Sequence, residues 1–497
     1  LNKIQQLNYY VKLDTALLDE KLPTTEEGLE QASLGSYNIV ILTEADDATI
    51  KAVNAFCRKR NIKLIVADTY GPFARIFNDF GNEFTVVDKN GEEAQEVMIK
   101  SITNEERGLV TLLETNRHHF EDGDEILITE VQGMETPDGK SINGTRHKIK
   151  VETAFSFRIG DTRGLTPYKI NGKAKEIKNP VLLKFKSYEE ASQLPNVAYD
   201  ANLLTSDFCK LSHPVLSHIA FAVLDEFRTA RGRLPNPWSV TDSDEFIRNA
   251  REHLKKLGKD EEVEKNFERF MRIFSFTCSG TFAPLAAFIG GFVSQEAVKA
   301  MTNKFVPIKQ FFYNDCIEVV PDLPQEADKL VEALNTIDTS AKNDRYDGLR
   351  TVVGNALTEK LAKTKLFMIG VGAIGCELLK NFAMIGAGRD KDGHLTITDP
   401  DVIETSNLNR QFLFREKHLR KPKSQTAAAA ALQMNKELKG HIIARLDKVH
   451  EGTAHIFTDK FFEDLTVVTN ALDNVQARRY IDSRCVSAKT PLLESGT

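Results

Sequence analysis

Residues 366–375 read LFMIGVGAIG, an apolar run that passes directly into a glycine-rich turn. The run predicts a buried strand, and the pattern G-x-G-x-x-G predicts a tight turn that opens a helix. Gly370 and Gly372 let the backbone approach a ligand closely. From Ala373 to Gly375 the start of the helix offers free N–H groups and a positive dipole end to a phosphate. The stretch therefore predicts a Rossmann-like α/β unit with a nucleotide site.

The chain after this turn continues the α/β pattern. Asp399 ends the next apolar run, and an acidic residue at that place typically binds the ribose hydroxyls of a nucleotide. Up to this residue, NAD and ATP fit equally well. The remaining elements alternate in the same way, with predicted helices at 376–385, 424–436 and 474–486 and predicted strands at 395–398, 441–446 and 465–469.

The residues that follow Asp399 favour a triphosphate over a dinucleotide. Arg410 can neutralise and orient phosphate oxygens, and Lys423, at a predicted helix start, can reach a phosphate as a point charge. Asn407 and Gln411 add neutral hydrogen-bond donors. A hydride-transfer site needs none of these cations, so the group indicates ATP.

Asp473 adds a metal to this prediction. It follows the apolar run 465–468 and is a hard oxygen ligand at the place where Mg²⁺ would bridge phosphates. Arg410, Lys423 and Asp473 are each unremarkable surface charges taken alone. Together with the glycine turn they predict a site for ATP and Mg²⁺.

The residues before this unit predict other kinds of secondary structure. Residues 37–71 read as strand, helix and strand, the order typical of a parallel sheet. From 77 to 190 short apolar runs alternate with Asn-Gly and Asp-Gly pairs, which predicts an antiparallel β module. Helical spacing prevails over 191–276, and the polar stretch 324–350 is typical of a linker.

Five motifs of the C-terminal unit together resemble the active adenylation domain of ubiquitin-activating enzymes. They are G-V-G-A-I-G-C-E at 370–377, T-D-P-D-V-I-E-T-S-N-L-N-R-Q-F-L-F at 398–414, K-P-K-S at 421–424, N-A-L-D-N-V-Q-A-R at 470–478 and P-L-L-E-S-G-T at 491–497. Residues 116–123 resemble the first catalytic-cysteine half-domain of the same family. Residues 304–311 resemble the end of its inactive adenylation domain, and Arg345-Tyr346-Asp347 resembles the start of the active one.

This resemblance covers nearly the whole chain and implies its organisation. The implied fold class is α/β, with two incomplete Rossmann-like adenylation units, an inserted β module and a helical bundle. The implied boundaries are 1–76 for the second half of the inactive adenylation domain, 77–190 for the first catalytic-cysteine half-domain, 191–276 for a four-helix insertion, 277–325 for the end of the inactive domain, 326–344 for a linker and 345–497 for the active domain.

The resemblance also implies an activity, namely ATP-dependent adenylation of the C-terminal glycine carboxylate of ubiquitin. Asp399 would hold the ribose, and Asp473, with help from Asp401, would hold Mg²⁺. The implied phosphate-binding residues are Asn407, Arg410, Gln411 and Lys423. Arg410, Lys423 and Asp473 would carry the chemistry by positioning and charge neutralisation. A cysteine would then take the acyl group as a thioester and pass it to a ubiquitin-conjugating enzyme.

The chain departs from the family pattern at its cysteines. The thioester cysteine of the family precedes a threonine, and none of the six cysteines here does so. We therefore expect this cysteine, the first half of the inactive domain and the ubiquitin-fold domain to lie outside this chain, and the chain alone to be inactive. Buried structural roles are expected for Cys376 and Cys485.

Composition limits the other possibilities. The chain has 497 residues, which suggests about three domains. A net charge of −6 argues against a nucleic acid or an anionic membrane as partner. There is no 18-residue apolar run and no signal peptide, and the scattered cysteines indicate a reducing compartment, with the cytosol and the nucleus both open.

Two other functions compete with adenylation. An NAD-dependent oxidoreductase would explain the glycine turn and Asp399, but it leaves Arg410, Lys423 and Asp473 without a role. A non-catalytic interaction module would be favoured if the phosphate-binding positions were lost, but all of them are present. Within the family, both adenylation halves on one chain favour the ubiquitin type over activators that divide them between chains.

Overall fold

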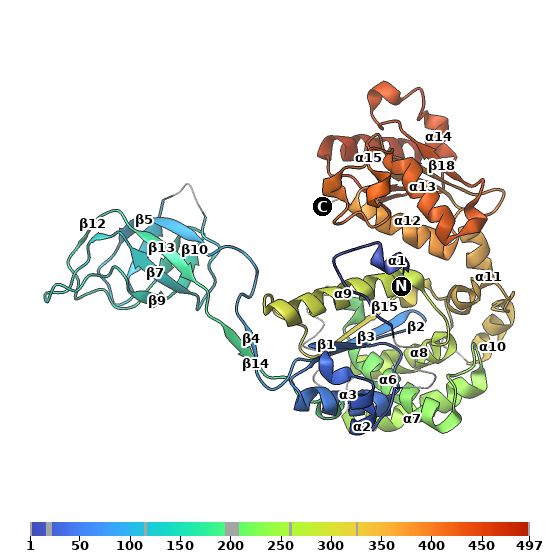
Figure 1. Ribbon diagram of the computed structural model, residues 1–497, viewed down its shortest axis with the longest axis horizontal. Coiled ribbons are helices and arrows are strands. Elements are labelled where there is room, and N and C mark those ends of the chain that lie inside the picture. The colour runs from blue at the N-terminus through green and yellow to red at the C-terminus, as the bar shows by residue number, and fades with distance from the viewer. Residues whose placement is uncertain are drawn as a thin grey trace.

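The computed structural model describes residues 2–15, 22–113, 117–193, 208–257, 261–324 and 327–495. An N-terminal α/β body and a C-terminal α/β body lie one above the other, and a β module stands apart from both (Figure 1). The predicted fold class is thereby confirmed. Asn116 and Gly496 of the family motifs lie outside the described residues. None of the helices described has the length and hydrophobicity of a membrane span.

The N-terminal body is built on a sheet with strand order β1-β2-β3-β15. As predicted, β1 (Ile39–Leu42) and β2 (Lys63–Tyr70) are parallel and α3 (Asp47–Lys59) connects them. Strand β3 (Phe73–Asp79), in which every residue is buried, pairs antiparallel with β2 and with β15 (Phe311–Asp315). The expected domain boundary at residue 76 therefore falls inside a core strand of this body.

Helices from distant parts of the sequence cover this sheet. Aromatic side chains of β3 pack against α8, with the ring centroids of Phe73 and Phe274 4.7 Å apart. Besides α3, the helices of this body are α2 (Glu26–Gln31), α4 (Tyr188–Ser192), α6 (His213–Arg231), α7 (Val240–Leu257), α8 (Glu261–Thr277), α9 (Ala283–Thr302) and α10 (Ala327–Thr336). Helix α10 corrects the expectation of a linker over 324–350, and its Leu334 packs against this core.

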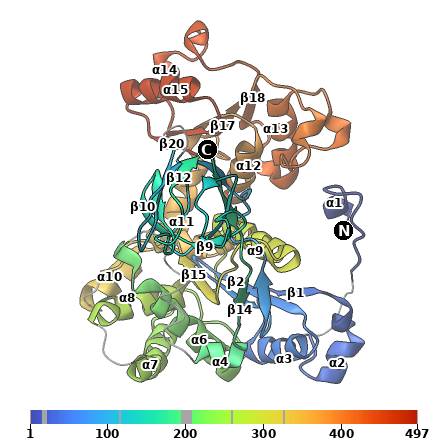
Figure 2. The ribbon, with the colours of Figure 1, turned by 90° about the vertical axis from the view of Figure 1, so that its left-hand side faces the viewer.

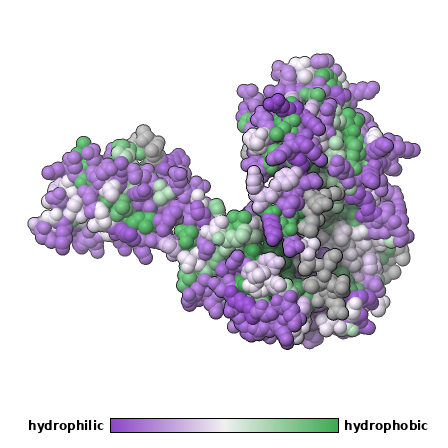
Figure 3. Space-filling model, viewed as in Figure 1, coloured by the Kyte–Doolittle hydropathy of each residue, from purple (hydrophilic) through white to green (hydrophobic). Residues whose placement is uncertain are grey.

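The β module is joined to the body by the antiparallel pair β4 (Phe84–Val86) and β14 (Val181–Leu183) (Figure 1). Its main sheet has the order β10-β11-β6-β5-β13-β7-β9, and it encloses a hydrophobic core of its own. Figure 3 shows the module as a separate, mostly hydrophilic lobe. Its strands are β5 (Glu96–Ile102), β6 (Leu109–Leu112), β7 (Glu125–Thr129), β8 (Gln132–Gly133), β9 (Arg146–Lys148), β10 (Lys150–Thr153), β11 (Ser156–Arg158), β12 (Tyr168–Ile170) and β13 (Lys173–Ile177).

The C-terminal body is a five-stranded parallel sheet in the order β18-β17-β16-β19-β20. Helices α12 and α13 share one hydrophobic core with the sheet, and α14 and α15 share another. Because all strands are parallel, the loops after their carboxyl ends meet at one edge. The elements are β16 (Lys365–Ile369), α12 (Ala373–Ile385), β17 (His394–Thr398), α13 (Lys423–Met434), β18 (Ile442–Arg445), α14 (Asp459–Glu463), β19 (Val467–Asn470), α15 (Val475–Ala488) and β20 (Leu492–Glu494).

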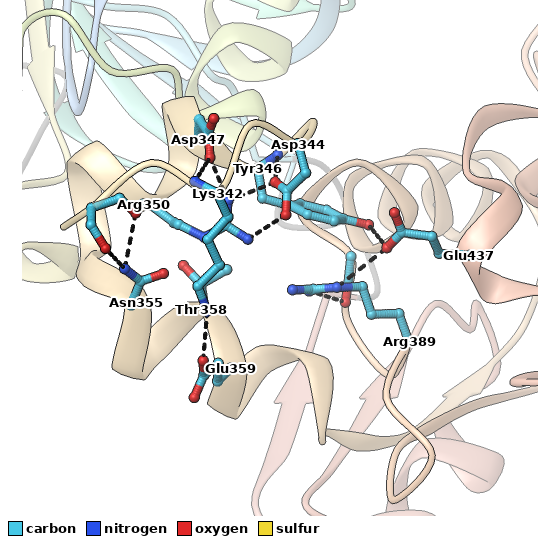
Figure 4. Close-up of polar contacts among 12 residues, drawn as sticks. Lys342, Asp344, Tyr346, Asp347, Arg350, Asn355, Thr358, Glu359, Arg389 and Glu437 are labelled. Carbon is cyan, nitrogen blue, oxygen red and sulfur yellow. Dashed lines mark hydrogen bonds and ion pairs between the residues drawn. The ribbon is translucent and has the colours of Figure 1, made fainter. Parts of the chain in front are cut away.

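Tyr346 anchors the start of the C-terminal body, just before α11 (Asp347–Ala362) (Figure 4). Its hydroxyl donates to Glu437 at 3.0 Å and accepts from the Asn435 amide at 2.8 Å, and the Arg389 guanidinium lies 3.9 Å over its ring. A Cβ at Gly386 would lie 2.5 Å from this ring, so the close contact requires glycine. Helices α9 and α12 also touch, which joins the two bodies.

Asp225 on α6 makes the stability of the N-terminal body depend on pH. Its carboxylate lies 3.5 Å from the Arg75 guanidinium, but burial outweighs this cation and raises the pKa of Asp225 to about 6. The folded chain therefore holds an extra proton between about pH 4 and pH 6, and the free energy of unfolding falls as the pH rises through that window. We expect Asp225→Asn to abolish this fall and to stabilise the body at neutral pH by roughly 2 kcal/mol.

Urea unfolding at several pH values, followed by fluorescence of the single tryptophan, measures this effect. Trp238 reports on the N-terminal body, because its ring stacks on Phe276 of α8. The exposed Asp322→Asn variant is the control and should behave like the unmodified chain. An unchanged pH slope in Asp225→Asn would contradict the assignment.

Candidate nucleotide site

A cavity of about 480 Å³ opens at the carboxyl edge of the C-terminal sheet. Its walls come from the glycine turn, the loop after β17, the start of α13 and the loops after β18 and β19. Almost all of the site residues predicted from the sequence line it. They are Gly370, Gly372, Ala373, Asp399, Asp401, Asn407, Arg410, Gln411, Lys423 and Asp473.

The three glycines of the turn have different roles. Gly370 has a φ of +94°, and a Cβ there would lie 2.5 Å from the Ala471 carbonyl oxygen. At Gly372 a Cβ would approach only the Gln411 amide nitrogen, at 4.0 Å, so this part of the backbone faces the cavity. Gly375 does not line the cavity, and a Cβ there would lie 2.3 Å from the Gly370 carbonyl. Its predicted role in ligand binding is corrected to close packing of α12 on the turn.

Substitution of Gly372 and of Gly375 by alanine should affect ligand binding and folding stability differently. We expect Gly372→Ala to leave the unfolding curve almost unchanged and to weaken ATP binding, because its methyl group enters the cavity. Gly375→Ala should lower the free energy of unfolding by about 1–3 kcal/mol, because the methyl group collides with backbone. Urea unfolding and ATP titration on both variants measure the contrast. Equal losses of stability would contradict it.

Asp399 is fixed at the base of the cavity. Its carboxylate accepts hydrogen bonds from the backbone N–H groups of Val371, at 2.7 Å, and Asp401, at 2.9 Å. Burial raises the pKa of Asp399, and these two N–H groups and Lys423 act in the opposite direction. The carboxylate thus ties the glycine turn to the next loop while keeping lone pairs available for hydroxyl groups of a ligand.

The loop after β17 brings two amides to the cavity wall. The Asn407 side chain accepts from the Glu404 backbone N–H at 2.9 Å, which holds the loop in a tight turn. Gln411 is only 4% exposed, yet its side-chain oxygen has no hydrogen-bond partner among the described residues. A buried amide oxygen without a partner is uncommon, and the side chain that carries it lines the cavity.

The two cations of the site are held differently. Lys423 is nearly buried, and its ammonium group donates to the Asp401 carboxylate at 2.9 Å. Arg410 donates to the Ser406 carbonyl at 2.9 Å and to the Asn409 side chain at 3.1 Å. Within the described ranges, Arg410 forms no ion pair with a carboxylate. Its charge is therefore available to an anion in the cavity.

The carboxylates of the cavity fit a metal that arrives with a triphosphate. Asp401 is engaged by Lys423, whereas the exposed Asp473 accepts no hydrogen bond and forms no ion pair in the part of the chain that is described. The described residues contain no group of three His, Cys, Asp or Glu side chains that could hold a metal by themselves. Mg²⁺ is commonly bound by only one or two carboxylates together with phosphate oxygens, so Asp473 suits this role.

Three residues after β18 were missed by the sequence prediction. Asp447, Lys448 and Val449 line the cavity, and the Asp447 carbonyl accepts from the Thr398 hydroxyl at 2.5 Å. The strand before them was predicted, and its carboxyl end had to reach the same edge as the glycine turn. That rule could have identified the loop, although it could not identify its individual contacts.

The cysteines agree with the structural roles expected for them. Cys376 and Cys485 are buried, and burial raises the pKa of their thiols to about 12 and about 11. A thiol with so high a pKa is almost entirely protonated at neutral pH and is a poor nucleophile. Neither cysteine lines the cavity.

Three protein families match successive parts of the chain. Residues 105–178 match the ubiquitin-activating enzyme E1 FCCH domain, residues 179–253 the ubiquitin-activating enzyme E1 four-helix bundle and residues 346–497 the ThiF family. These segments correspond to the β module, the first of the helices that cover the N-terminal sheet, and the C-terminal body.

Known proteins match the chain from end to end. Ubiquitin-like modifier-activating enzyme 6 of Homo sapiens is 40% identical over 501 residues, which cover 100% of this chain and 45% of that protein. Ubiquitin-activating enzyme E1 1 of Schizosaccharomyces pombe is 39% identical and is covered to 46%. Among solved structures, tRNA N6-threonylcarbamoyladenosine dehydratase of E. coli shares 22% identity, with a TM-score of 0.28 over 31% of this chain and 60% of that one. The chain thus spans about half the length of the curated relatives it matches.

Proposed function

Because this chain is homologous along its whole length to ubiquitin-activating enzymes, we propose that it carries the ATP site at which the C-terminal carboxylate of ubiquitin is adenylated. The observation that carries the proposal is the cavity itself. Motif residues from separate loops, which the sequence marked independently, line one space at the edge of a parallel sheet. Their chemistry is that of a triphosphate site, with cations, N–H donors and a free carboxylate.

The arrangement suggests an orientation for ATP. Asp399, held against the glycine turn, suits the ribose hydroxyl groups. The phosphates would then be bound by other residues that line the same cavity, namely Arg410, Lys423, Asn407 and Gln411. Asp473 would hold Mg²⁺, which on binding neutralises phosphate charge and orients the leaving group. In this arrangement Asp401 orients the Lys423 ammonium group, since the two are already paired.

The proposed reaction needs no nucleophile from this chain. The C-terminal carboxylate oxygen of ubiquitin attacks the α-phosphorus of ATP, and the bond to the bridging oxygen breaks to release pyrophosphate. Arg410 and Lys423 stabilise the negative charge that develops on the phosphate oxygens. The protein contributes orientation and charge neutralisation in a site that was formed before the substrate arrived.

Later steps require groups that we assign to the rest of a longer protein. A cysteine thiolate would displace AMP from the adenylate to form a thioester, which a conjugating enzyme then accepts. Cys57, Cys278, Cys376 and Cys485 are buried and form no disulfide, which supports a reducing compartment for the protein, and we propose the cytosol and the nucleus.

The alternative function is an NAD-dependent oxidoreductase, which would explain the glycine turn and Asp399 but no other residue of the site. Arg410 and Asp473, which form no ion pair within the described residues, favour ATP, because a nicotinamide site gains nothing from a metal-binding carboxylate. The family matches also favour activation over redox chemistry.

The test is ubiquitin-dependent exchange of labelled pyrophosphate into ATP by the full-length polypeptide. Exchange that requires both ubiquitin and Mg²⁺ is the expected result. Absence of exchange with every ubiquitin-like protein, together with measurable NAD binding, would overturn the proposal in favour of the oxidoreductase.

A further inference from the structure

The described residues of the motif P-L-L-E-S-G-T, at 491–495, contribute nothing to the lining of the nucleotide cavity. They form β20, which is last in the strand order of the C-terminal sheet and ends beside the marked C-terminus (Figure 2). Strand β20 pairs in parallel with β19, and Glu494 lies opposite Asn470, the last residue of β19. Both residues therefore lie at the carboxyl edge of the sheet, where the cavity opens.

A short loop between β19 and α15 carries the carboxylate that we assign to Mg²⁺. Its residues 471–474 all line the cavity, and none of them belongs to a helix or a strand. The Ala471 N–H donates to a carbonyl of β16 at 2.8 Å, and the Asn474 side chain accepts from the Ala477 N–H at 3.1 Å. Between these two points, no backbone N–H of the loop donates to a described residue. The position of Asp473 is therefore set by the two ends of the loop.

Glu494 contacts the chain at both ends of this loop. Its Oε2 accepts a hydrogen bond from the side-chain amide of Asn470, directly before the loop, at 2.9 Å. Its Oε1 lies 3.3 Å from Nε of Arg478, which belongs to the first turn of α15. One carboxylate thus joins the end of β19 to the start of α15. We call these three residues the Glu494 clamp.

The two contacts of the clamp differ in strength. Asn470 is fully buried, so its hydrogen bond to a charged acceptor is shielded from water, and the Ser495 hydroxyl donates to its carbonyl at 2.6 Å. The side chains of Arg478 and Glu494 are 27% and 32% exposed, so their ion pair adds little to the stability of the fold. It nevertheless fixes where the first turn of α15 lies relative to β20. The clamp therefore restricts the geometry of the loop more than it stabilises the body.

We propose that Glu494 is a positioning residue for Asp473, acting through the clamp on both ends of the loop that carries it. This role rests on the proposed function, in which Asp473 binds Mg²⁺. A metal ligand must be held within about 0.5 Å of its productive geometry, and loss of a residue that supports such a ligand typically lowers metal affinity or activity by about 10- to 100-fold. If Glu494 merely secured the edge of the sheet, the Mg²⁺ requirement would not depend on it.

The Mg²⁺ requirement of ubiquitin-dependent pyrophosphate exchange, measured on the full-length polypeptide, tests the positioning role. Glu494→Gln keeps an oxygen for the buried Asn470 amide and loses the charge that faces Arg478. We expect it to need roughly tenfold more Mg²⁺ for half-maximal exchange, and Glu494→Ala, which loses both contacts, to need more still. Asp464→Asn removes an ion pair with Lys365 in the same body and should leave the requirement unchanged. An unchanged requirement in both Glu494 variants would overturn the proposal.

A double-mutant cycle shows whether Glu494 acts through Asp473. In the Asp473→Ala background, Glu494→Gln should cause no further rise in the Mg²⁺ requirement, because the ligand that the clamp positions is already absent. A rise by the same factor in both backgrounds would show that Glu494 acts independently of Asp473, and the proposal would then be wrong.

Hydrogen–deuterium exchange without nucleotide or metal tests the clamp apart from any activity. We expect Glu494→Gln to speed exchange at the backbone N–H groups of Ala477 and Arg478, which bond to Asn474 in the first turn of α15. Asp464→Asn should not change it. Unchanged exchange in Glu494→Gln would refute the clamp whether or not the protein activates ubiquitin. Absence of pyrophosphate exchange in the unmodified polypeptide would instead refute the proposed function and, with it, the role of Glu494 toward the metal.

Discussion

Asp473→Ala is expected to lower ubiquitin-dependent pyrophosphate exchange by a factor on the order of 10² to 10³, similar to the loss of one preorganised electrostatic contact in other active sites. The reason is geometric. Asp473 is an exposed carboxylate that lines the nucleotide cavity and forms no ion pair with a cation of the described chain, whereas Asp401 is already paired with Lys423. Removing Asp473 thus removes the chain's available metal ligand without disturbing a folded contact.

The Mg²⁺ dependence of exchange separates this role from others. Asp473→Ala should shift the Mg²⁺ requirement to higher concentration, because the metal would then be held by phosphates and water alone. Asp482→Ala removes the same charge from an exposed position on α15 and should have no effect. A loss of exchange at an unchanged Mg²⁺ requirement would show that Asp473 acts in some other way.

Arg410→Ala is expected to have an effect of similar size, a loss of exchange on the order of 10² to 10³. The guanidinium is held by two neutral acceptors and keeps its full charge for the ligand. Arg410→Lys should recover only a small part of the activity, because an ammonium group cannot present two parallel donors to a phosphate. The folded state should be unaffected, since Arg410 is exposed and forms no ion pair within the described residues.

The matched control for Arg410 is Arg479→Ala on the exposed side of α15. Exchange should be normal in that variant. ATP titration by calorimetry would show whether Arg410 contributes to ground-state binding or to the reaction itself. If exchange by Arg410→Ala remained near the unmodified level, Arg410 would be an ordinary surface charge and Lys423 would have to provide the neutralisation alone.

The elements of the C-terminal body could be predicted from the sequence because each carries a strong local pattern. The apolar run before Gly370 became β16, and the alanine-rich stretch after Lys423 became α13, whose small side chains at Ala427 and Ala431 permit close packing on the sheet. The glycine turn predicted the position of the cavity, because a turn this tight requires glycine at specific positions. Local patterns of this kind do not depend on the rest of the chain.

Other features depend on contacts between distant residues and were not visible. β3 continues the core sheet past the expected boundary because its partner, β15, lies more than 200 residues away in sequence. Gly375 belongs to the glycine motif, yet its role is set by the Gly370 carbonyl that packs against it. The pairing of Asp401 with Lys423 likewise follows from the fold. Nothing in the sequence indicated that these two side chains would bind each other rather than a ligand.

The two strands that join the β module to the body pair with each other, with Val86 opposite Val181. The chain thus leaves the body and returns to it at neighbouring points, and the module closes around a core of its own. In evolutionary terms, the β module is a unit that a lineage could acquire, lose or exchange in a single step. The sheet of the N-terminal body would keep its strand register, because the module is attached to that body through the β4–β14 pair.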